Sequence, residues 1–458
     1  MLPERNSRLR RALVRLCAVA AMVVISAAAP PARADPAGLV EQEITFSSGE
    51  LTFHGTVIAP DTGTRHPAMV MVHGSGRVSR DGYRQEAEAF ARSGIVTLIY
   101  DKRPKQSKSD VDFELLADDA LAALRALRTH PGVDPDRTGL WGVSEGGWVA
   151  PLAAAGSTDV AFVVTVGAPG VAPERQQSWN LVNRLAAAGV SGSLVDTVSR
   201  TTLGLLVGAG QFPEAGYDPA PVLARITQPV LGLWGDLDRV IPGVESLRVF
   251  QESLDRGGNR HYTLRSVPGA DHTMRRSPDG FQRGDDLSPA YLEQVAAWVN
   301  SAEPPAADVG PLPRQERQSA PVEAGSPAVQ LAAVVLLLVA FAAYGVRWRR
   351  AGKAPVRRPA RLLATTGLLS VLGLLGYLGH LASTGAKSLG VVVLGRPLPW
   401  LALQLLAVAV VVATVVTARQ AWQARADLTT GRRVRLGLLV AGGALFVPWA
   451  VHWGLLLP

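Results

Sequence analysis

Apolar residues form two kinds of pattern along residues 35–301, which are short continuous runs and recurrences at helical spacing. Apolar residues recur at helical spacing in several places, as at Leu116, Ala120 and Leu124. Strands that are apolar on both faces and alternate with such helices predict an α/β domain with a mostly parallel sheet covered by helices on both faces. Largely apolar runs that predict these strands lie at residues 68–72, 95–100, 138–142, 160–166 and 229–234, and an extended segment follows at residues 262–267.

Three segments depart from this alternation. Residues 44–46 and 51–59 flank the turn-forming residues 47–50 and predict an antiparallel hairpin ahead of the parallel strands. Residues 171–227 carry a helical pattern, so we expect them to form a cap over one end of the sheet. Residues 302–327 contain six prolines among polar residues and predict a stiff linker after the domain of residues 35–301.

After the linker, the pattern changes to long apolar stretches. Each is close to the ~20 residues that cross ~30 Å of hydrocarbon. None contains Asp, Glu, Lys or Arg, which are costly at the centre of a bilayer. We therefore expect residues 328–458 to form an all-α transmembrane domain of four helices, at residues 329–346, 362–382, 398–418 and 436–457.

The N-terminal residues 1–34 are typical of an export signal. An arginine-rich start is followed by an apolar run at residues 16–29 and by Ala32-Arg33-Ala34, a cleavage site of the small-x-small type. The alternative is an uncleaved anchor helix, although the apolar run is short for a span. The one cysteine, Cys17, lies within this segment, which excludes a disulfide framework and a cysteine-based zinc site.

Charge is distributed unevenly along the chain. The net charge of +8 is made up of +5 in residues 1–34, −10 in residues 35–326 and +13 in residues 327–458. Because the positive charge lies at the membrane-associated ends, we expect no nucleic-acid partner. Within residues 327–458, most of the Lys and Arg lie in the loops after the first and third apolar stretches. This distribution favours a cytoplasmic position for these two loops. The predicted location is the cell membrane, multi-pass, with residues 35–301 on the extracytoplasmic side.

A candidate nucleophile lies in Gly142-Val143-Ser144-Glu145-Gly146, between a predicted strand and a predicted helix. In this setting the small residues allow a sharp turn that exposes the serine hydroxyl, and the next N–H can face an oxyanion. The pattern alone is weak, because a tight turn whose serine caps the helix would look the same.

Partners for this serine follow later in the chain. A serine hydroxyl is a poor nucleophile and needs a base that is oriented by an acid. Asp236 and Asp238 follow the strand at residues 229–234, and Asp271-His272 follows the extended segment at residues 262–267. The order Ser, Asp, His on successive strand ends is the order found in an α/β-hydrolase sheet.

These motifs together make residues 35–301 similar to the α/β-hydrolase superfamily, in its branch of exported esterases, dienelactone-hydrolase-like enzymes and prolyl-oligopeptidase-like peptidases. The resemblance implies Ser144 as nucleophile, Asp238 as acid and His272 as base, with Asp236 as the alternative acid. The C-terminal apolar stretches lie outside it. The sequence segments that carry the resemblance are His73-Gly74-Ser75-Gly76, Tyr100-Asp101-Lys102-Arg103, Gly142–Gly147, Gly235-Asp236-Leu237-Asp238 and Gly269–His272.

The resemblance also implies an oxyanion hole made of backbone N–H groups. Its donors would be the amides of Glu145 and Ser75, with Gly76 as a further candidate, while Gly142 and Gly146 shape the turn around the nucleophile. His73 precedes the donors, and we expect it to be a structural residue of that turn.

The sequence therefore predicts a membrane-tethered extracytoplasmic serine hydrolase that acts on a carboxylic ester through an acyl-enzyme. This chemistry needs no metal and no cofactor. The expected partners are the lipid bilayer and a small-molecule ester or acyl substrate, with lipid and cell-envelope compounds among the alternatives. A serine peptidase of the same fold is the nearest alternative function, and a non-catalytic membrane receptor or transport component is another.

Overall fold

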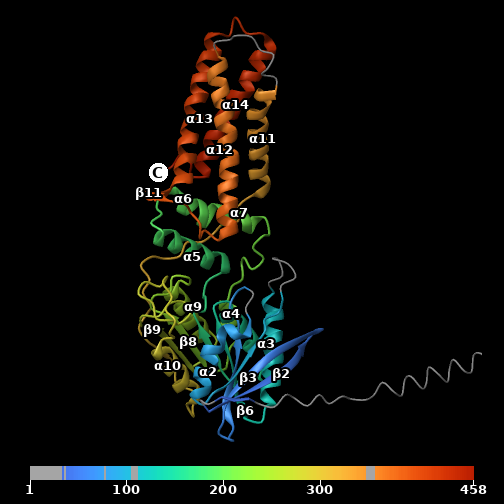
Figure 1. The fold of residues 1–458 in the computed structure, drawn as a ribbon, viewed down its shortest axis with the longest axis vertical. Helices are drawn as coiled ribbons and strands as arrows, with labels where there is room; N and C mark the ends of the chain where they lie inside the picture. The colour runs from blue at the N-terminus through green and yellow to red at the C-terminus, as the bar shows by residue number, and fades with distance from the viewer. Residues whose placement is uncertain (1–32, 36–37, 77–78, 105–111, 347–355) are drawn as a thin grey trace, which may run out of the picture.

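A computed structural model of the chain describes residues 33–35, 38–76, 79–104, 112–346 and 356–458. Residues 1–32 of the predicted export signal lie outside these ranges. Figure 1 shows a sheet domain at one end, an upright helical bundle at the other, and short helices between them.

One sheet organises the first domain, and its centre is parallel. In the described ranges it has ten strands, in the order β1-β2-β3-β5-β4-β6-β7-β8-β9-β10. The strands from β5 to β10 run parallel, while β1, β2 and β3 pair antiparallel with their neighbours. The bounds are β1 Arg33–Asp35, β2 Leu39–Ser48, β3 Leu51–Pro60, β4 His66–Val72, β5 Val96–Tyr100, β6 Val133–Val143, β7 Val163–Val166, β8 Val230–Gly235, β9 Tyr262–Val267 and β10 Asp308–Val309.

Helices cover both faces of the sheet, as the apolar strands predicted. Along β4, Val70 and Val72 face one core and Met69 and Met71 face the other, because side chains alternate along a strand. The first core is closed by α3 (Phe113–Arg128), α4 (Gly146–Ala155) and α9 (Gly243–Arg256), and the second by α2 (Arg84–Arg92) and α10 (Pro289–Asn300). The predicted fold class is confirmed.

Four long helices in the described part of the C-terminal region are long and apolar enough to cross a membrane. Small residues let the helices approach closely: Gly367 lies against Phe341, and Gly442 against Ala340. Large apolar side chains such as Leu331 and Leu405 point away from the bundle and are 65% and 72% exposed. The helices are α11 Pro327–Val346, α12 Arg357–Thr384, α13 Leu398–Gln423 and α14 Thr430–His452.

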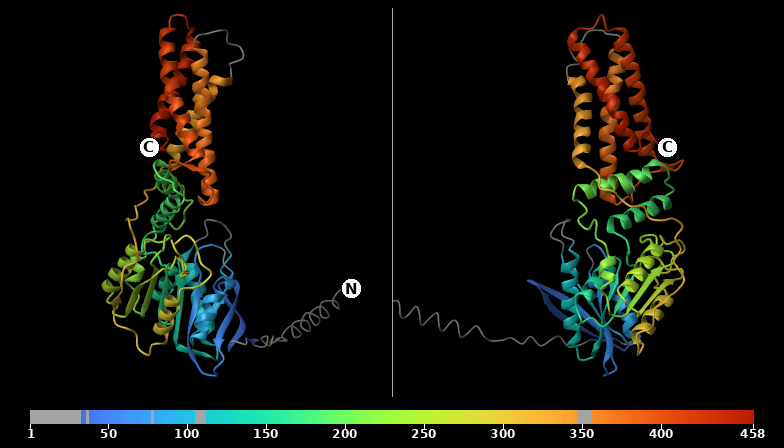
Figure 2. Two further views of the ribbon diagram at one scale, coloured as in Figure 1. Left: turned by 60° about the vertical axis from the view of Figure 1, so that its left-hand side comes forward. Right: turned by 180° about the vertical axis from the view of Figure 1, so that it is seen from behind.

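The segment predicted as a cap is helical and lies between the sheet and the bundle (Figure 2). Its apolar side chains, among them Leu185 and Leu194, belong to the same buried cluster as the bundle residues Phe446 and Trp453. The helices are α5 Pro173–Ala187, α6 Ser193–Asp196, the π-helix η2 Thr197–Thr202, α7 Leu203–Gly208 and α8 Ala220–Leu223. The bundle therefore buries one face of the cap in addition to the contact surfaces between its own helices.

The proline-rich residues 302–326 are not a free spacer. Residue Ser319 is buried, and its N–H donates to Oε1 of Glu245 at 2.7 Å. Glu245 also pairs with Arg175 of the cap at 2.6 Å. The segment contributes the short edge strand β10, so proline content predicted its stiffness but not its contact with the domain.

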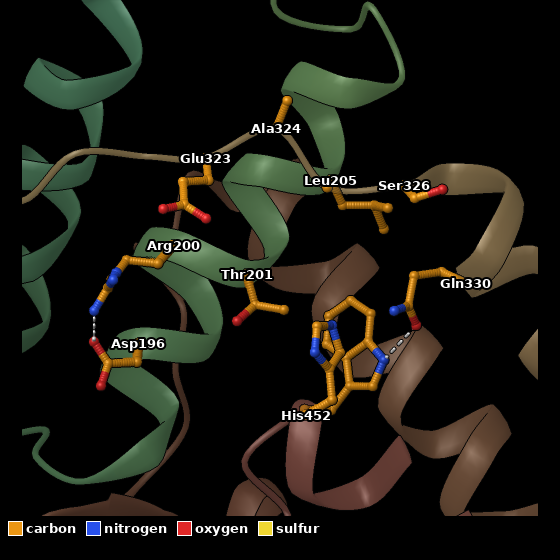
Figure 3. A pocket seen from close by; sticks show the side chains of 11 residues that line it. Asp196, Arg200, Thr201, Leu205, Glu323, Ala324, Ser326, Gln330 and His452 are labelled. Atoms are coloured by element: carbon orange, nitrogen blue, oxygen red, sulfur yellow. Dashed lines mark hydrogen bonds and ion pairs between the residues drawn. The ribbon is translucent and has the colours of Figure 1, made fainter. Parts of the chain in front are cut away.

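A cavity of about 350 Å³ lies at the junction of cap, linker and bundle (Figure 3). Arg200 and Asp196 form an ion pair at 3.9 Å on one side of it. Gln330 lies on the other side of the cavity. Its Oε1 accepts the indole N–H of Trp453 at 3.0 Å. Ser144, Asp238 and His272 are not among its lining residues, so it is separate from the candidate active site.

Candidate active site

Ser144 lies in the turn between β6 and α4. Its backbone φ is +55°, a conformation that costs energy in a residue with a side chain and that occurs at functional turns. The Ser144 N–H donates to the carbonyl of Val166 in the neighbouring strand at 2.9 Å, and this bond holds the turn against the sheet. The strain and the bond together favour the exposed-nucleophile interpretation over a simple helix cap.

The two glycines of the motif make this turn sterically possible. A Cβ on Gly142 would collide with the carbonyl oxygen of Gly146. A Cβ on Gly146 would approach the carbonyl oxygen of Val72 to 2.5 Å. The predicted shaping role of both glycines therefore has a direct cause, which is the close approach of three backbone segments around Ser144.

The candidate base and acid meet at the same edge of the sheet. His272 follows β9, and its Nδ1 lies 2.8 Å from Oδ2 of Asp238, which follows β8. The other carboxylate oxygen, Oδ1, accepts the N–H groups of Val240 and Ile241 at 2.8 and 2.9 Å. The Asp238 carboxylate is buried and fixed at both oxygens, so it can orient the imidazole ring.

Electrostatics favour a His272 that binds a proton readily. Burial by itself would lower the pKa of His272, but the charge of Asp238 and its hydrogen bond outweigh that effect, and the pKa is raised above its ordinary value of 6.5. A raised pKa suits a group that must take up a proton from a serine hydroxyl.

Ser144 and His272 line the same cavity of about 190 Å³. Among the described residues, the Ser144 hydroxyl makes no hydrogen bond to the imidazole. Catalytic hydrogen bonds are often long without substrate and shorten in the complex, so the shared cavity is the informative feature.

Two other residues near the motifs take structural positions. Asp236, the alternative acid, pairs with Arg314 at 3.1 Å. The ring of His73 is buried and hydrogen-bonds to the carbonyl of Tyr100, and burial lowers its pKa to about 4. A neutral, buried His73 fits the expected structural role.

The loop after β4 supplies one candidate oxyanion donor. Ser75 lines the cavity, whereas Gly76, the further candidate, has a φ of +94° and is not among the lining residues. The preceding amide, of Gly74, donates to the Tyr83 hydroxyl at 3.0 Å. Burial raises the pKa of Tyr83, so that hydroxyl stays protonated.

Lys102 joins this loop to the turn that holds Ser144. Its Nζ lies 2.6 Å from the carbonyl oxygen of Gly74 and 2.5 Å from Oε1 of Glu145, and both charged side chains are about 95% buried. The Gly74 carbonyl belongs to the same peptide unit as the Ser75 N–H, so Lys102 fixes the direction of that N–H. Sequence reasoning quoted the Asp101-Lys102-Arg103 motif but assigned Lys102 no role.

No group of three or more His, Cys, Asp or Glu suited to a metal ion occurs within the described ranges. The arrangement of Ser144, His272 and Asp238 is one that can carry out acyl transfer with side chains alone.

Comparison with known proteins finds a sequence-family match over part of the chain. Residues 121–278, which include Ser144, Asp238 and His272, match the family model described as BAAT / Acyl-CoA thioester hydrolase C terminal. Solved structures of similar fold include a dienelactone hydrolase from Anabaena variabilis, at 19% identity and TM-score 0.38, covering 57% of this chain and 97% of that one. A cold-adapted esterase from an Arctic metagenomic library has 16% identity and TM-score 0.36, with 59% and 98% covered.

Curated relatives match shorter segments. The thiohydrolase aneE of Aspergillus aculeatus is 36% identical over 105 residues, 22% of this chain and 33% of its own. The quorum-quenching protein AidA of Acinetobacter baumannii is 28% identical over 128 residues, 27% and 42% of the two chains. The polyketide transferase ATR5 of Stachybotrys chlorohalonatus is 28% identical over 191 residues, 39% and 61%. The matched segments thus span a third to three fifths of these relatives.

Proposed function

Because strands β2 to β9 and their helices form an α/β-hydrolase domain, we propose that the protein is a serine hydrolase of carboxylic esters. The observation that carries the proposal is the strained Ser144 sharing a cavity with a His272 that is held by Asp238. A peptidase of the same mechanism and a purely binding domain remain the alternatives.

In the proposed reaction, the Ser144 hydroxyl attacks the ester carbonyl while Nε2 of His272 takes up its proton. The resulting oxyanion is stabilised by the backbone N–H groups of Glu145 and Ser75. The protonated imidazole then donates its proton to the leaving alcohol, and an acyl group remains on Ser144. Water, deprotonated by His272, releases the acid and restores the serine. Asp238 stabilises the imidazolium in both halves.

Thioesters are the second candidate substrate class. The matching family model is described as an acyl-CoA thioester hydrolase domain, and one relative is named a thiohydrolase. A thioester would pass through the same acyl-enzyme, because only the leaving group differs. Comparing an oxygen ester and a thioester of the same acyl chain would separate the two substrate classes.

We propose that catalysis takes place outside the cytoplasm, in an enzyme held by its four apolar helices. The support is the positive charge of the loops predicted to be cytoplasmic, together with the predicted export signal. Protease protection of the sheet domain in right-side-out vesicles would contradict this sidedness and leave the hydrolytic proposal intact.

The decisive test is Ser144→Ala in the full chain, assayed with p-nitrophenyl butyrate. We expect the rate to fall about 10⁴-fold or more, because the variant lacks the nucleophile. An exposed serine of the same domain provides the control, Ser93→Ala, which should keep full activity. Activity that survives Ser144→Ala contradicts the proposal. Cleavage in a peptide panel with no ester turnover would favour the peptidase, and folded protein without a phosphonate adduct on Ser144 would favour a binding role.

A further inference from the structure

The cavity beside Ser144 contains a buried carboxyl group that the proposed reaction does not use. Glu86 lies in the first turn of α2, is 6% exposed, and lines the cavity together with Ser144 and His272. Its Oε2 has no hydrogen-bond partner among the described residues. A buried carboxyl oxygen without a partner is unfavourable in a folded protein, so its presence calls for a functional explanation.

Neighbouring cations do not pair with Glu86 within the described ranges. Arg275 donates to Gln85 and to the carbonyl of Asp285, and Arg283 pairs with Asp271 at 3.4 Å. Burial raises the pKa of Glu86, and a hydrogen bond from its own backbone N–H and the charges of the two arginines offset this effect only in part. In both protonation states a carboxyl keeps an oxygen that can accept a hydrogen bond.

The remaining walls of the cavity are mostly apolar. Val143, Val166 and the ring of Trp141 line it, and the Trp141 N–H is already used by the Tyr291 hydroxyl at 3.0 Å. A cavity of about 150 Å³ holds a benzene molecule. The 190 Å³ here therefore admits a substrate group of roughly six heavy atoms. Besides the reacting Ser144 and His272, the polar side chains that line the cavity are those of Ser75, Tyr83, Thr273 and Glu86, and Glu86 is the acidic one among these four.

We propose that the substrate group that enters this cavity ends in a hydrogen-bond donor, a hydroxyl or an amino group, which binds the Glu86 carboxyl. The inference rests on the proposed ester hydrolysis at Ser144. An apolar chain of the same length would leave Oε2 of Glu86 buried without a partner, and sites of this kind reject analogues that lack the donor. Glu86 is thus a specificity-determining residue, and the substrate class is a short ester with a polar tip.

Two matched pairs of esters test the proposal with the full chain in lipid nanodiscs. The first pair varies the acyl part, with p-nitrophenyl hexanoate and its ω-hydroxy derivative. The second varies the alcohol part, with hexyl acetate and its ω-hydroxy derivative. We expect the hydroxylated member of one pair to have a kcat/KM about tenfold or more higher than that of its plain partner. Equal rates within both pairs would overturn the inference.

Three variants assign the preference to Glu86. Glu86→Leu removes the acceptor and should abolish the preference, because the kcat/KM of the hydroxylated ester falls to that of its plain partner. Glu86→Gln keeps an acceptor oxygen and should retain most of it. Glu88→Gln, on the same helix but paired with Arg92 at the surface, is the matched control and should change nothing. A preference that persists in Glu86→Leu would contradict the assignment.

Stability and labelling keep the outcomes distinguishable. Thermal unfolding should show Glu86→Leu at least as stable as the wild type, because a buried carboxyl with one unpartnered oxygen is replaced by an apolar group. Labelling of Ser144 by a phosphonate should be equal in Glu88→Gln and the wild type, and should still occur in both Glu86 variants. If the wild type cleaves neither pair and takes up no label, the proposed function fails. If it cleaves plain and hydroxylated esters alike, only the present inference fails.

Discussion

The surroundings of Ser144 and the junction between cap and bundle are held together by different forces. Around Ser144, buried charges and directed hydrogen bonds fix single atoms, as in the contacts of Lys102 and Asp238. At the junction, apolar side chains from both regions share one cluster. The polar contacts there are mainly to backbone, such as the Ser193 N–H donating to the carbonyl of Pro458 at 2.9 Å. The contacts around Ser144 fix the positions of the candidate catalytic groups, whereas the cluster at the junction attaches the cap to the bundle.

The cap connects these two regions. On its bundle side α5 is apolar, whereas on its sheet side Asn183 donates to the carbonyl of Arg239 at 3.0 Å and Gln176 to that of Val240 at 2.8 Å. Both acceptors directly follow Asp238 in the chain. The cap therefore contacts both the bundle and the loop that follows Asp238. Helices that served only as a membrane anchor would not require this chain of contacts.

The comparison predicts the largest loss of activity from Asp238→Asn. The amide lacks the charge that stabilises the imidazolium, and in serine proteases this change lowers turnover about 10⁴-fold. We expect the rate of p-nitrophenyl ester hydrolysis to fall about 10³–10⁴-fold. The packing of the cap against the bundle should change little, because Asp238 is not part of the apolar cluster there. A loss below tenfold would show that Asp238 does not act as the acid, and Asp236→Asn would then be the next variant.

The same variant alters the pH profile. His272 must be unprotonated to accept the serine proton, so activity falls as pH drops through its pKa. In the wild type Asp238 raises that pKa, which places the acid limb above the ordinary value of 6.5. Removing the charge leaves burial as the main effect, so the acid limb of Asp238→Asn should move to lower pH. A limb that stays in place would contradict the coupling.

Lys102→Met should have the next largest effect, because it breaks the link between the two candidate oxyanion donors. Glu145 would remain buried without its partner, which costs about 3–5 kcal/mol of unfolding free energy. We expect kcat to fall roughly 10- to 100-fold with little change in KM, since the donors act in the transition state. Denaturant unfolding and steady-state kinetics measure the two effects.

A double variant separates fold from catalysis at this position. Lys102→Met combined with Glu145→Gln removes both charges and should recover much of the stability. If kcat also returns to the wild-type value, Lys102 serves only the fold. If kcat stays low in the stable double variant, Lys102 positions the oxyanion loop.

The smallest effect on activity is expected at the junction, from Leu194→Asp. Leu194 is fully buried in the shared cluster, and a charge there should destabilise the attachment of the cap by about 2–5 kcal/mol. Because the change is remote from Ser144, hydrolysis of a short ester should fall less than about fivefold below the melting transition. Thermal unfolding in nanodiscs and ester kinetics measure the two quantities.

Ala188 provides the matched site for this variant, because it is exposed at the end of α5. Ala188→Asp should leave both the melting transition and the activity unchanged. A Leu194→Asp protein that unfolds like the wild type would show that the shared cluster contributes little. If Leu194→Asp lost as much activity as Asp238→Asn, the junction would control catalysis as strongly as the surroundings of Ser144 do.

The sequence predicted the features that depend on local pattern. Apolar runs located the parallel strands, and the motif around Ser144 and the residues after β8 and β9 identified groups that the structure brings to one sheet edge. These inferences succeed because strand direction and chain order decide which residues share an edge. The short strands β1 and β10 escaped notice because they carry no apolar run.

Other features depend on contacts between distant segments. The pairing of Lys102 with Glu145 joins two motifs that were considered separately, and nothing local indicates it. The burial of the cap against the bundle depends on tertiary packing. Glu86 did leave a signal: with Ala87, Phe90 and Ala91 it occupies the core-facing stripe of α2, where a carboxyl is unusual.

The shared cluster of cap and bundle has a practical consequence for extracting the protein in detergent. A detergent that loosens α12 and α14 would also uncover the apolar face of the cap, and through α5 it would act on the loop after Asp238. Inactivation during solubilisation would then report the state of the four long apolar helices while the sheet stays folded, and adding lipid back should reverse it.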